Sequence, residues 1–220
     1  MKLNQVAAIT STVRRLVQDP EGIRNGLTRI REIGYEAVQI SGIGPMPENE
    51  LLAITKDLGL KICATHEPAQ TITENPEAVV ERLEKLGVDQ VANPFPNPQP
   101  LTPEDLDELC RKLDHAGSVL RRAGITLSYH NHDLEFMRVN GRIIYEQLYE
   151  KTDPQHLQAE PDTYWIQLGG GDVVHWCERL KDRLPILHMK DYGIKERKVP
   201  EIRPIGGGNL DWKRIIAAAE

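Results

Sequence analysis

One short run near the middle of the chain combines the side chains most able to do chemistry. In Tyr129-His130-Asn131-His132-Asp133-Leu134-Glu135-Phe136, two imidazoles and two carboxylates follow the apolar stretch 124–127, which is typical of a buried strand. Side chains alternate between the two faces of a strand, so His130 and His132 are expected to point the same way. Buried polar groups are costly without partners, and this run is therefore the first candidate for a functional site.

Similar groups follow three other predicted strands. They are Thr65-His66-Glu67, Glu160-Pro161-Asp162 and His188-Met189-Lys190-Asp191. Neutral imidazole and carboxylate form a suitable mixed ligand set for Mn, Zn, Fe, Co or Mg. In a βα barrel the active-site groups lie at the carboxyl ends of the strands. Together these strand ends predict a divalent-metal site.

Each candidate also has a purely structural interpretation. His188 could be a hydrogen-bonded core histidine and Asp162 could cap the helix that follows it, but we favour both as metal ligands. His130 and His132 could instead hydrogen-bond the loop backbone. We expect His66 to contact substrate rather than metal.

The roles of two further charged residues also have alternative structural interpretations. Glu135 could be an ordinary loop acid, and Lys190 could form a structural ion pair with Asp191 or Asp162. Of two glycine runs, 169–171 reads as a flexible rim loop in which Asp172 caps the next helix, rather than as a phosphate-binding loop.

A recurring pattern predicts the elements that position these groups. A charged amphipathic helix, a glycine and a short apolar strand recur around Gly34, Gly59, Gly87 and Gly124. Helix starts are marked by Asp19-Pro20-Glu21, Asn75-Pro76-Glu77 and Thr102-Pro103-Glu104. Such alternation predicts a parallel sheet. We expect seven major helices and seven strands, the strands near 4–9, 36–40, 60–65, 88–92, 125–130, 157–161 and 185–189.

The pattern favours an α/β protein with a TIM (β/α)8-type barrel over an open doubly wound sheet. No glycine-rich phosphate loop follows the first predicted strand. An eight-stranded barrel takes roughly 250 residues, so the eighth strand is expected to be missing at the C-terminus. The proline-rich segment 93–100 is predicted to be a stiff rim loop, so residues 1–220 are treated as a single domain.

Composition narrows the classes of partner. A net charge of −6 and the lack of a long basic block argue against nucleic acid. No stretch approaches 18 apolar residues and the first residues lack a signal-peptide core, so we expect no membrane partner and a cytoplasmic location. Cys63, Cys110 and Cys177 are far apart and are expected to be reduced thiols.

Five motifs taken in chain order resemble the sugar phosphate isomerase/epimerase family of the xylose isomerase-like TIM barrels. They are 129–136, Asp162-Thr163-Tyr164-Trp165, Gly170-Gly171-Asp172, Leu187-His188-Met189-Lys190-Asp191 and 206–212. This superfamily also holds inosose dehydratases, ketose 3-epimerases and endonuclease IV. The resemblance covers essentially the whole chain.

The resemblance implies a metal held by a Glu, an Asp, a His and a Glu on strands 5 to 8. Asp162 and His188 match the middle two positions, whereas His130 stands where many relatives carry glutamate. The strand 8 glutamate would fall beyond Glu220, and Gly207 also departs from the family pattern. These departures indicate either a truncated form of a longer enzyme, which we favour, or catalytic impairment. The open barrel edge that results could pair with another chain, so a homo-oligomer is possible.

The function that follows is a metal-dependent isomerase or epimerase acting through an enediolate on a small sugar or polyol. His130, Asp162 and His188 would hold the divalent metal, while Glu135, His132 or Lys190 would move the proton. His66 and Trp165 would position the sugar. A lyase resembling inosose dehydratase and a non-catalytic binding or assembly module are the alternatives. A nuclease like endonuclease IV is disfavoured because its three-metal cluster needs more ligands than can be placed here.

Overall fold

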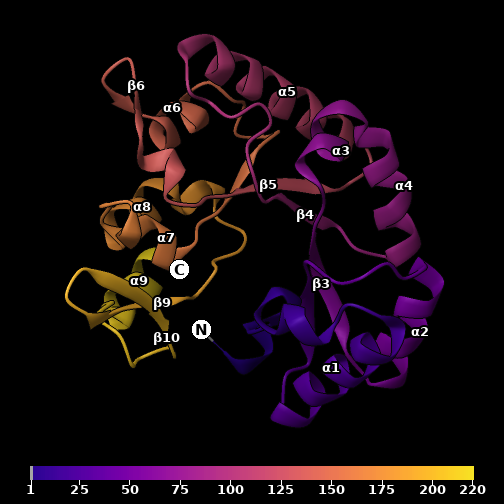
Figure 1. Ribbon diagram of the computed structural model, residues 1–220. Coiled ribbons are helices and arrows are strands. Elements are labelled where there is room, and N and C mark those ends of the chain that lie inside the picture. Colours follow the sequence, from indigo (N-terminus) through magenta and orange to yellow (C-terminus); the bar gives the residue numbers. More distant parts are fainter. Residues whose placement is uncertain (1) are drawn as a thin grey trace.

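A curved parallel sheet forms the centre of the protein, as the computed structural model shows for residues 2–220 (Figure 1). Every pair of neighbouring strands in it is parallel. The strand order is β1 (Ala8–Ile9), β2 (Ala37–Ile40), β3 (Lys61–His66), β4 (Gln90–Asn93), β5 (Thr126–His130) and β8 (Gln158–Glu160). The sheet follows chain order because each strand is returned by a helix, which confirms the predicted βα architecture.

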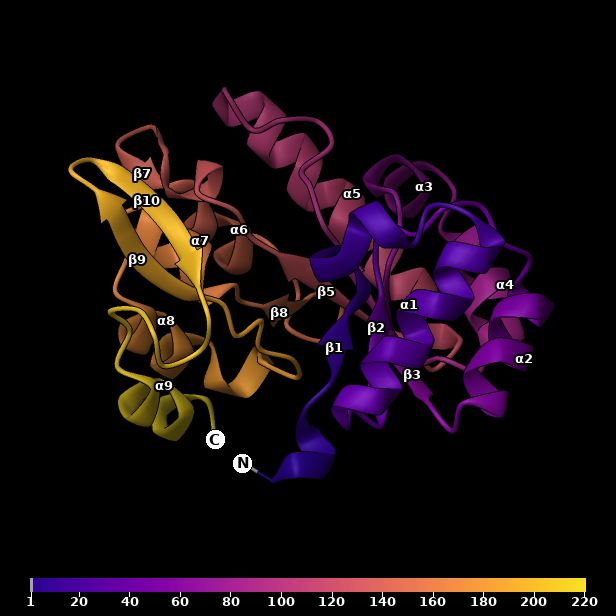
Figure 2. The same cartoon turned by 60° about the horizontal axis from the view of Figure 1, so that its bottom comes forward.

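The helices pack around the outside of this sheet (Figures 1 and 2). They are α1 (Pro20–Ile33), α2 (Glu48–Asp57), α3 (Ala69–Glu74), α4 (Pro76–Leu86), α5 (Pro103–Arg122), α6 (Ile144–Glu150), α7 (Thr163–Leu168), α8 (Val173–Leu180) and α9 (Trp212–Ala219). Short 3-10 helices span Leu3–Gln5, Thr10–Leu16, Leu134–Phe136 and Lys181–Arg183. No helix within residues 2–220 is both long and apolar enough to cross a membrane.

The predicted helix boundaries are confirmed by their caps. Asp19 accepts a hydrogen bond from Gly22 N at the start of α1, and Thr102 forms a full capping box with Asp105 at the start of α5. α1 ends at Gly34, whose left-handed φ of 113° carries no Cβ penalty. Asp172 caps α8 as expected.

Strand register brings the carboxyl ends of the strands to one edge. His130 lies opposite Glu160 across the β5–β8 pair, and His66 lies opposite Ala92 across the β3–β4 pair. The interior and the contacts with the helices are apolar, with Leu27, Leu109 and Leu127 among the buried residues. This core holds the strand ends in place, and the polar groups gather above it.

Two predicted strands are shorter than expected. The first was placed at 4–9, but only Ala8–Ile9 pair with β2. The seventh was placed at 185–189, and the described residues contain only a parallel bridge between Asp162 and His188. Pro185 has no N–H to donate to a neighbouring strand. The bridge consists of two backbone hydrogen bonds, from the His188 N–H to the Pro161 carbonyl and from the Thr163 N–H to the His188 carbonyl.

Two hairpins were not predicted, so the expected count of seven strands was wrong. β6 (Arg138–Val139) pairs with β7 (Arg142–Ile143), and β9 (Asp191–Glu196) pairs with β10 (Val199–Arg203). The second hairpin projects beside α8 and α9 (Figure 2). Its turn residue Lys198 has a φ of 67°, and its strands carry mixed charge rather than a clean apolar alternation.

Candidate metal centre

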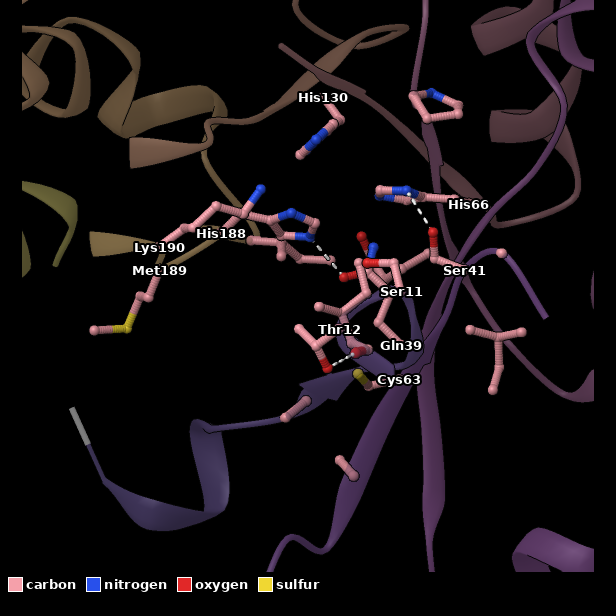
Figure 3. Close-up of a pocket in the computed structure, with 18 of the residues that line it drawn as sticks. Ser11, Thr12, Gln39, Ser41, Cys63, His66, His130, His188, Met189 and Lys190 are labelled. Atoms are coloured by element: carbon pink, nitrogen blue, oxygen red, sulfur yellow. Dashed lines mark hydrogen bonds between the residues drawn. The ribbon is translucent and has the colours of Figure 1, made fainter. Parts of the chain in front are cut away.

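Imidazole and carboxylate groups from distant parts of the chain meet at the carboxyl edge of the sheet. Figure 3 shows His66, His130 and His188 facing one another across the cavity, with Gln39 beneath them. The ring centroids of His66 and His130 lie 5.0 Å apart, and those of His130 and His188 lie 4.5 Å apart. The strand ends therefore form one cluster, as the sequence predicted.

The Glu160 carboxylate lies at the centre of the first half of this cluster. Its Oε2 lies 2.6 Å from His66 Nε2, 3.3 Å from His188 Nε2 and 3.4 Å from His130 Nδ1. Its Oε1 accepts a hydrogen bond of 2.6 Å from Gln39 Nε2. Glu160 is fully buried, and the Gln39 amide and the surrounding imidazoles offset the cost of burying its charge.

Asp162 lies on the other side of the His130 and His188 rings from Glu160, and its two carboxylate oxygens have different partners. Oδ1 accepts the Tyr164 and Trp165 N–H groups and so caps α7. Oδ2 lies 2.7 Å from Lys190 Nζ, 3.9 Å from His188 Nδ1 and 4.0 Å from His130 Nε2. Both structural alternatives considered for Asp162 and Lys190, the cap and the ion pair, are therefore present, and Oδ2 still faces the two imidazoles.

Burial and neighbouring charges shift the pKa values of the residues in this cluster in different directions. Burial works to raise the pKa of Glu160, but the charges of His188 and His66 hold it well below its usual range. Burial works to lower the pKa of His188, but Glu160 and Asp162 raise it. Burial, together with the nearby His188 charge, lowers the pKa of His130 well below its ordinary value. His130 therefore presents a neutral imidazole, the form that binds metal.

The donor set fits a divalent transition metal. One ligand atom from each of His66, His130, Glu160 and His188 can be chosen so that all four lie within 4.8 Å of one another. His130 Nδ1 is buried and has no hydrogen-bond partner among the described residues. Mixed imidazole and carboxylate donors suit Zn, Mn, Fe and Co.

An aromatic wall borders the cluster on the side of the rim loop. His132 stacks on Phe95 with centroids 4.4 Å apart, and it lies 5.0 Å from the Trp165 ring. Lys190 Nζ lies 5.3 Å from the same indole. All four residues line the cavity. Burial and the Lys190 charge lower the pKa of His132 to about 4, so this imidazole is neutral at pH 7. Its Nδ1 is buried and has no hydrogen-bond partner within the part of the chain that the structure describes.

Glu135 lies apart from this wall. It is fully buried and is not among the described residues that line the cavity. Its carboxylate accepts hydrogen bonds from the Tyr129 hydroxyl at 2.6 Å and from the His132 N–H at 2.7 Å. Burial raises its pKa. In this arrangement Glu135 holds the loop that carries His132.

The second glycine run is occupied by an internal anion. Asp191 accepts hydrogen bonds from the N–H groups of Gly206, Gly208 and Leu210 and from the Trp212 indole. Burial works to raise the pKa of Asp191, but these donors lower it. The loop 206–210 therefore binds a carboxylate of its own chain.

Two members of the cluster were missed from the sequence. In the sequence, Glu160 belongs to a polar strand end but is not predicted as a ligand, and Gln39 lies within the predicted strand 36–40 without any predicted role. The signal for Glu160 was the two-residue spacing to Asp162, the same spacing that indicated a shared face for His130 and His132. Gln39 had no such signal, because its partners lie 121 and 149 residues away.

A model of the xylose isomerase-like TIM barrel family matches residues 27–220. The chain belongs to this family. The match covers most of the elements described above, and the resemblance inferred from the five motifs is confirmed.

Individual relatives are more distant. An inosose dehydratase of Lactiplantibacillus plantarum is 28% identical over 132 residues, which is 60% of this chain and 43% of that protein. One of Mesomycoplasma hyopneumoniae is 23% identical over 199 residues, which is 80% of this chain and 64% of that protein. The matches thus span between two fifths and two thirds of these curated relatives.

Solved structures show the same fold. A sugar phosphate isomerase/epimerase from Parabacteroides distasonis superposes with a TM-score of 0.83 at 25% identity, covering 100% of this chain and 83% of that one. An L-ribulose 3-epimerase superposes with a TM-score of 0.71 at 16% identity, covering 97% and 76%.

Proposed function

We propose that this chain acts as a metal-dependent isomerase or epimerase on a keto-sugar, a sugar phosphate or a ketone derived from a polyol. The observation that carries the proposal is the convergence of His130, His188 and two buried carboxylates at the carboxyl edge of the sheet, beside a cavity lined by aromatic rings. Such a combination of metal-capable donors and a hydrophobic wall suits a small polyhydroxy ketone better than nucleic acid or a membrane surface.

His130, Asp162 and His188 are the proposed metal ligands, with His66 and Glu160 as a competing donor set on the other side of the same imidazoles. A bound divalent ion would polarise the substrate carbonyl and so acidify the neighbouring C–H bond. The two donor sets share His130 and His188. They differ in the carboxylate that completes the site, which is Asp162 in the first set and Glu160 in the second.

The remaining proposed roles belong to residues of the aromatic wall. His132 lines the cavity with a neutral imidazole, the protonation state from which a general base accepts a proton from substrate carbon. Lys190 reaches the same space from the Asp162 side and can return a proton. His66 and Trp165 would position the sugar. We assign Glu135 to holding the His132 loop, in place of the direct proton transfer expected from the sequence.

The second candidate is a dehydratase. The inosose dehydratases among the relatives favour it, because dehydration starts with removal of the same kind of proton. The C–O bond to a hydroxyl group on the next carbon would then break, and a general acid would protonate that hydroxyl so that it leaves as water. The His132 and Lys190 pair supports either outcome.

A deuterium-exchange experiment tests the proposal. The protein is incubated in D2O with Mn²⁺, Co²⁺ or Zn²⁺ and a panel of ketoses, ketose phosphates and inososes, and products are followed by NMR. Deuterium at the carbon beside the carbonyl, with an epimer or isomer, supports the proposal, while an unsaturated product supports the dehydratase. No deuterium uptake with any metal across the panel, in a protein that stays folded, would point to a binding or assembly module.

A further inference from the structure

Gln39 joins the two halves of the cluster through a single buried amide. It lies on β2 and is only 4% exposed. Its Nε2 donates to Glu160 Oε1 at 2.6 Å, and its Oε1 lies 2.7 Å from His188 Nε2, the contact drawn as a dashed line in Figure 3. One side chain thus touches both a carboxylate and an imidazole of the proposed metal centre.

The partners of this amide determine its orientation. If the amide were turned over, its oxygen would face the Glu160 oxygen at 2.6 Å, and two acceptors would meet without a proton between them. The amide nitrogen must therefore face Glu160, which leaves the amide oxygen facing His188. A carbonyl oxygen only accepts, so His188 Nε2 must carry a proton.

The ring of His188 cannot be turned to escape this conclusion. A half-turn about its outer bond would place a ring carbon opposite the Gln39 oxygen and leave that oxygen buried without a donor. Leaving a buried carbonyl without a hydrogen-bond donor destabilises the fold, so this orientation of the ring is disfavoured. With the proton on Nε2, the nitrogen left to bind a cation is Nδ1, which lies 3.9 Å from Asp162 Oδ2.

His130 is oriented in a similar way but is not fixed by a hydrogen bond. Its Nδ1 faces Glu160 Oε2 at 3.4 Å and has no hydrogen-bond partner among the described residues, and its Nε2 faces Asp162 Oδ2 at 4.0 Å. Both imidazoles therefore turn one nitrogen toward Glu160 or Gln39 and the other toward Asp162. Metal-binding histidines typically donate their second N–H to a carboxylate or carbonyl, which fixes the tautomer, and Gln39 supplies that acceptor for His188.

We propose that Gln39 is a positioning residue that keeps the proton of His188 on Nε2 and commits His188 to bind a divalent cation through Nδ1, on the Asp162 side. Glu160 then serves as an outer partner of the imidazoles and not as a ligand. The inference rests on the proposed metal-dependent function and extends it by choosing between the two donor sets. It also gives a role to a residue with no metal-binding chemistry of its own.

The test uses the protein labelled with ¹⁵N-histidine, and its readout is the protonation of each imidazole nitrogen. Long-range ¹H–¹⁵N spectra are recorded for the metal-free protein at pH 9 and for the Zn²⁺-loaded protein, with His188 assigned by His188→Gln. We expect Nε2–H in both states and Zn²⁺ on Nδ1. A proton on Nδ1 with Zn²⁺ on Nε2 would overturn the proposal.

Two variants separate positioning from general damage. Gln39→Met keeps the length of the side chain but removes both hydrogen bonds, and we expect its Kd for Zn²⁺ to rise by roughly 10- to 100-fold. Ser41→Ala is the matched control, because Ser41 pairs with His66 Nδ1 at 3.1 Å on the same wall. Its Kd should stay within about threefold of wild type, since outer contacts matter only around true ligands.

Each remaining outcome has a defined meaning. An unchanged Kd and an unchanged His188 tautomer in Gln39→Met would refute the positioning role. A large loss in Ser41→Ala would instead favour the His66 and Glu160 donor set. If wild type binds no Zn²⁺ at all, the metal-dependent function fails, and with it the choice of Nδ1 as ligand. The metal-free spectrum still decides separately whether Gln39 sets the tautomer.

Discussion

Lys190 Nζ lies 2.7 Å from Asp162 Oδ2, the carboxylate oxygen that also faces His130 and His188. Asp162 is fully buried, and the Lys190 ammonium supplies the positive charge closest to this oxygen. Burial raises the pKa of Asp162 despite this ammonium. A divalent cation at the same oxygen would compete with Lys190, which makes the ion pair a sensitive probe of the site.

Replacing Lys190 should make stability depend on metal. Lys190→Met leaves the Asp162 charge buried without its partner, so we expect a loss of roughly 1–3 kcal/mol in the free energy of unfolding in chelator. Added Zn²⁺ should restore more stability to the variant than to wild type, because it replaces the missing charge. Denaturant melts with EDTA and with Zn²⁺ measure both effects.

The control is Lys112→Met, which removes a surface pair with Glu108 at 3.1 Å. Such pairs contribute about 0–1 kcal/mol, and no metal dependence is expected. Equal metal responses from the two variants would contradict a cation site at Asp162.

The rim aromatic Phe95 should contribute to substrate binding. It is 55% exposed yet stacks on His132, so its free surface faces the cavity. Phe95→Ala should raise KM by about 3- to 10-fold with little change in kcat, in line with about 0.5–1.5 kcal/mol for an aromatic contact. Met137→Ala, at a similarly exposed apolar residue outside the cavity lining, should leave KM unchanged. A fall in kcat alone would assign Phe95 to the chemical step instead.

His132 should make stability sensitive to acid. Its pKa in the folded protein is about 4, below the ordinary value of 6.5. As pH falls through this range the unfolded chain binds a proton before the folded protein does, so stability present above pH 6.5 is lost progressively down to about pH 4. His132→Asn should flatten this part of the stability profile, measured by urea unfolding at several pH values.

His175, which is exposed on α8, provides the comparison for this pH experiment. His175→Asn should leave the wild-type slope between pH 6.5 and 4 intact. An NMR titration of His132 with a midpoint near 6.5 would contradict the assignment of a buried neutral imidazole, whatever the unfolding data show.

The glycine loop around Asp191 should tolerate almost no added volume at one position. A Cβ on Gly208 would collide with the Tyr192 carbonyl and the Asp191 carboxylate, whereas a Cβ on Gly207 would lie 3.1 Å from the Pro204 carbonyl. Gly208→Ala should therefore break several hydrogen bonds to Asp191, at about 2–4 kcal/mol. That corresponds to a fall in Tm of at least about 4 °C, measured by calorimetry. If Gly207→Ala lowers the Tm as much as Gly208→Ala does, that result would argue against this anion-binding role of the loop.

Local signals predicted the fold well because they act over a few residues. The caps at Asp19 and Thr102 and the helix-ending Gly34 are decided by neighbours within one turn, and all three were found where predicted. The hairpin β9–β10 lacked such signals, because its charged strands depend on pairing with each other rather than on burial.

The site was harder to predict than the fold. Strand-end position was enough to gather His130, Asp162 and His188, and the structure does bring them together. The position of Glu160 at a strand end could not show that its carboxylate faces three imidazoles, because strand register and sheet curvature decide which carboxylate points inward. Gln39 depends entirely on contacts across the barrel, which no local pattern encodes.

We propose that His130, Asp162 and His188 bind one divalent metal ion. Titration calorimetry of the chelator-treated protein with Zn²⁺, Mn²⁺ and Co²⁺ measures this binding. We predict one high-affinity site per chain and a rise in Tm on loading, both lost in Asp162→Asn, which retains a helix cap but removes the charge. If wild type binds none of these metals and loses no stability under chelator, the three residues do not form a metal site.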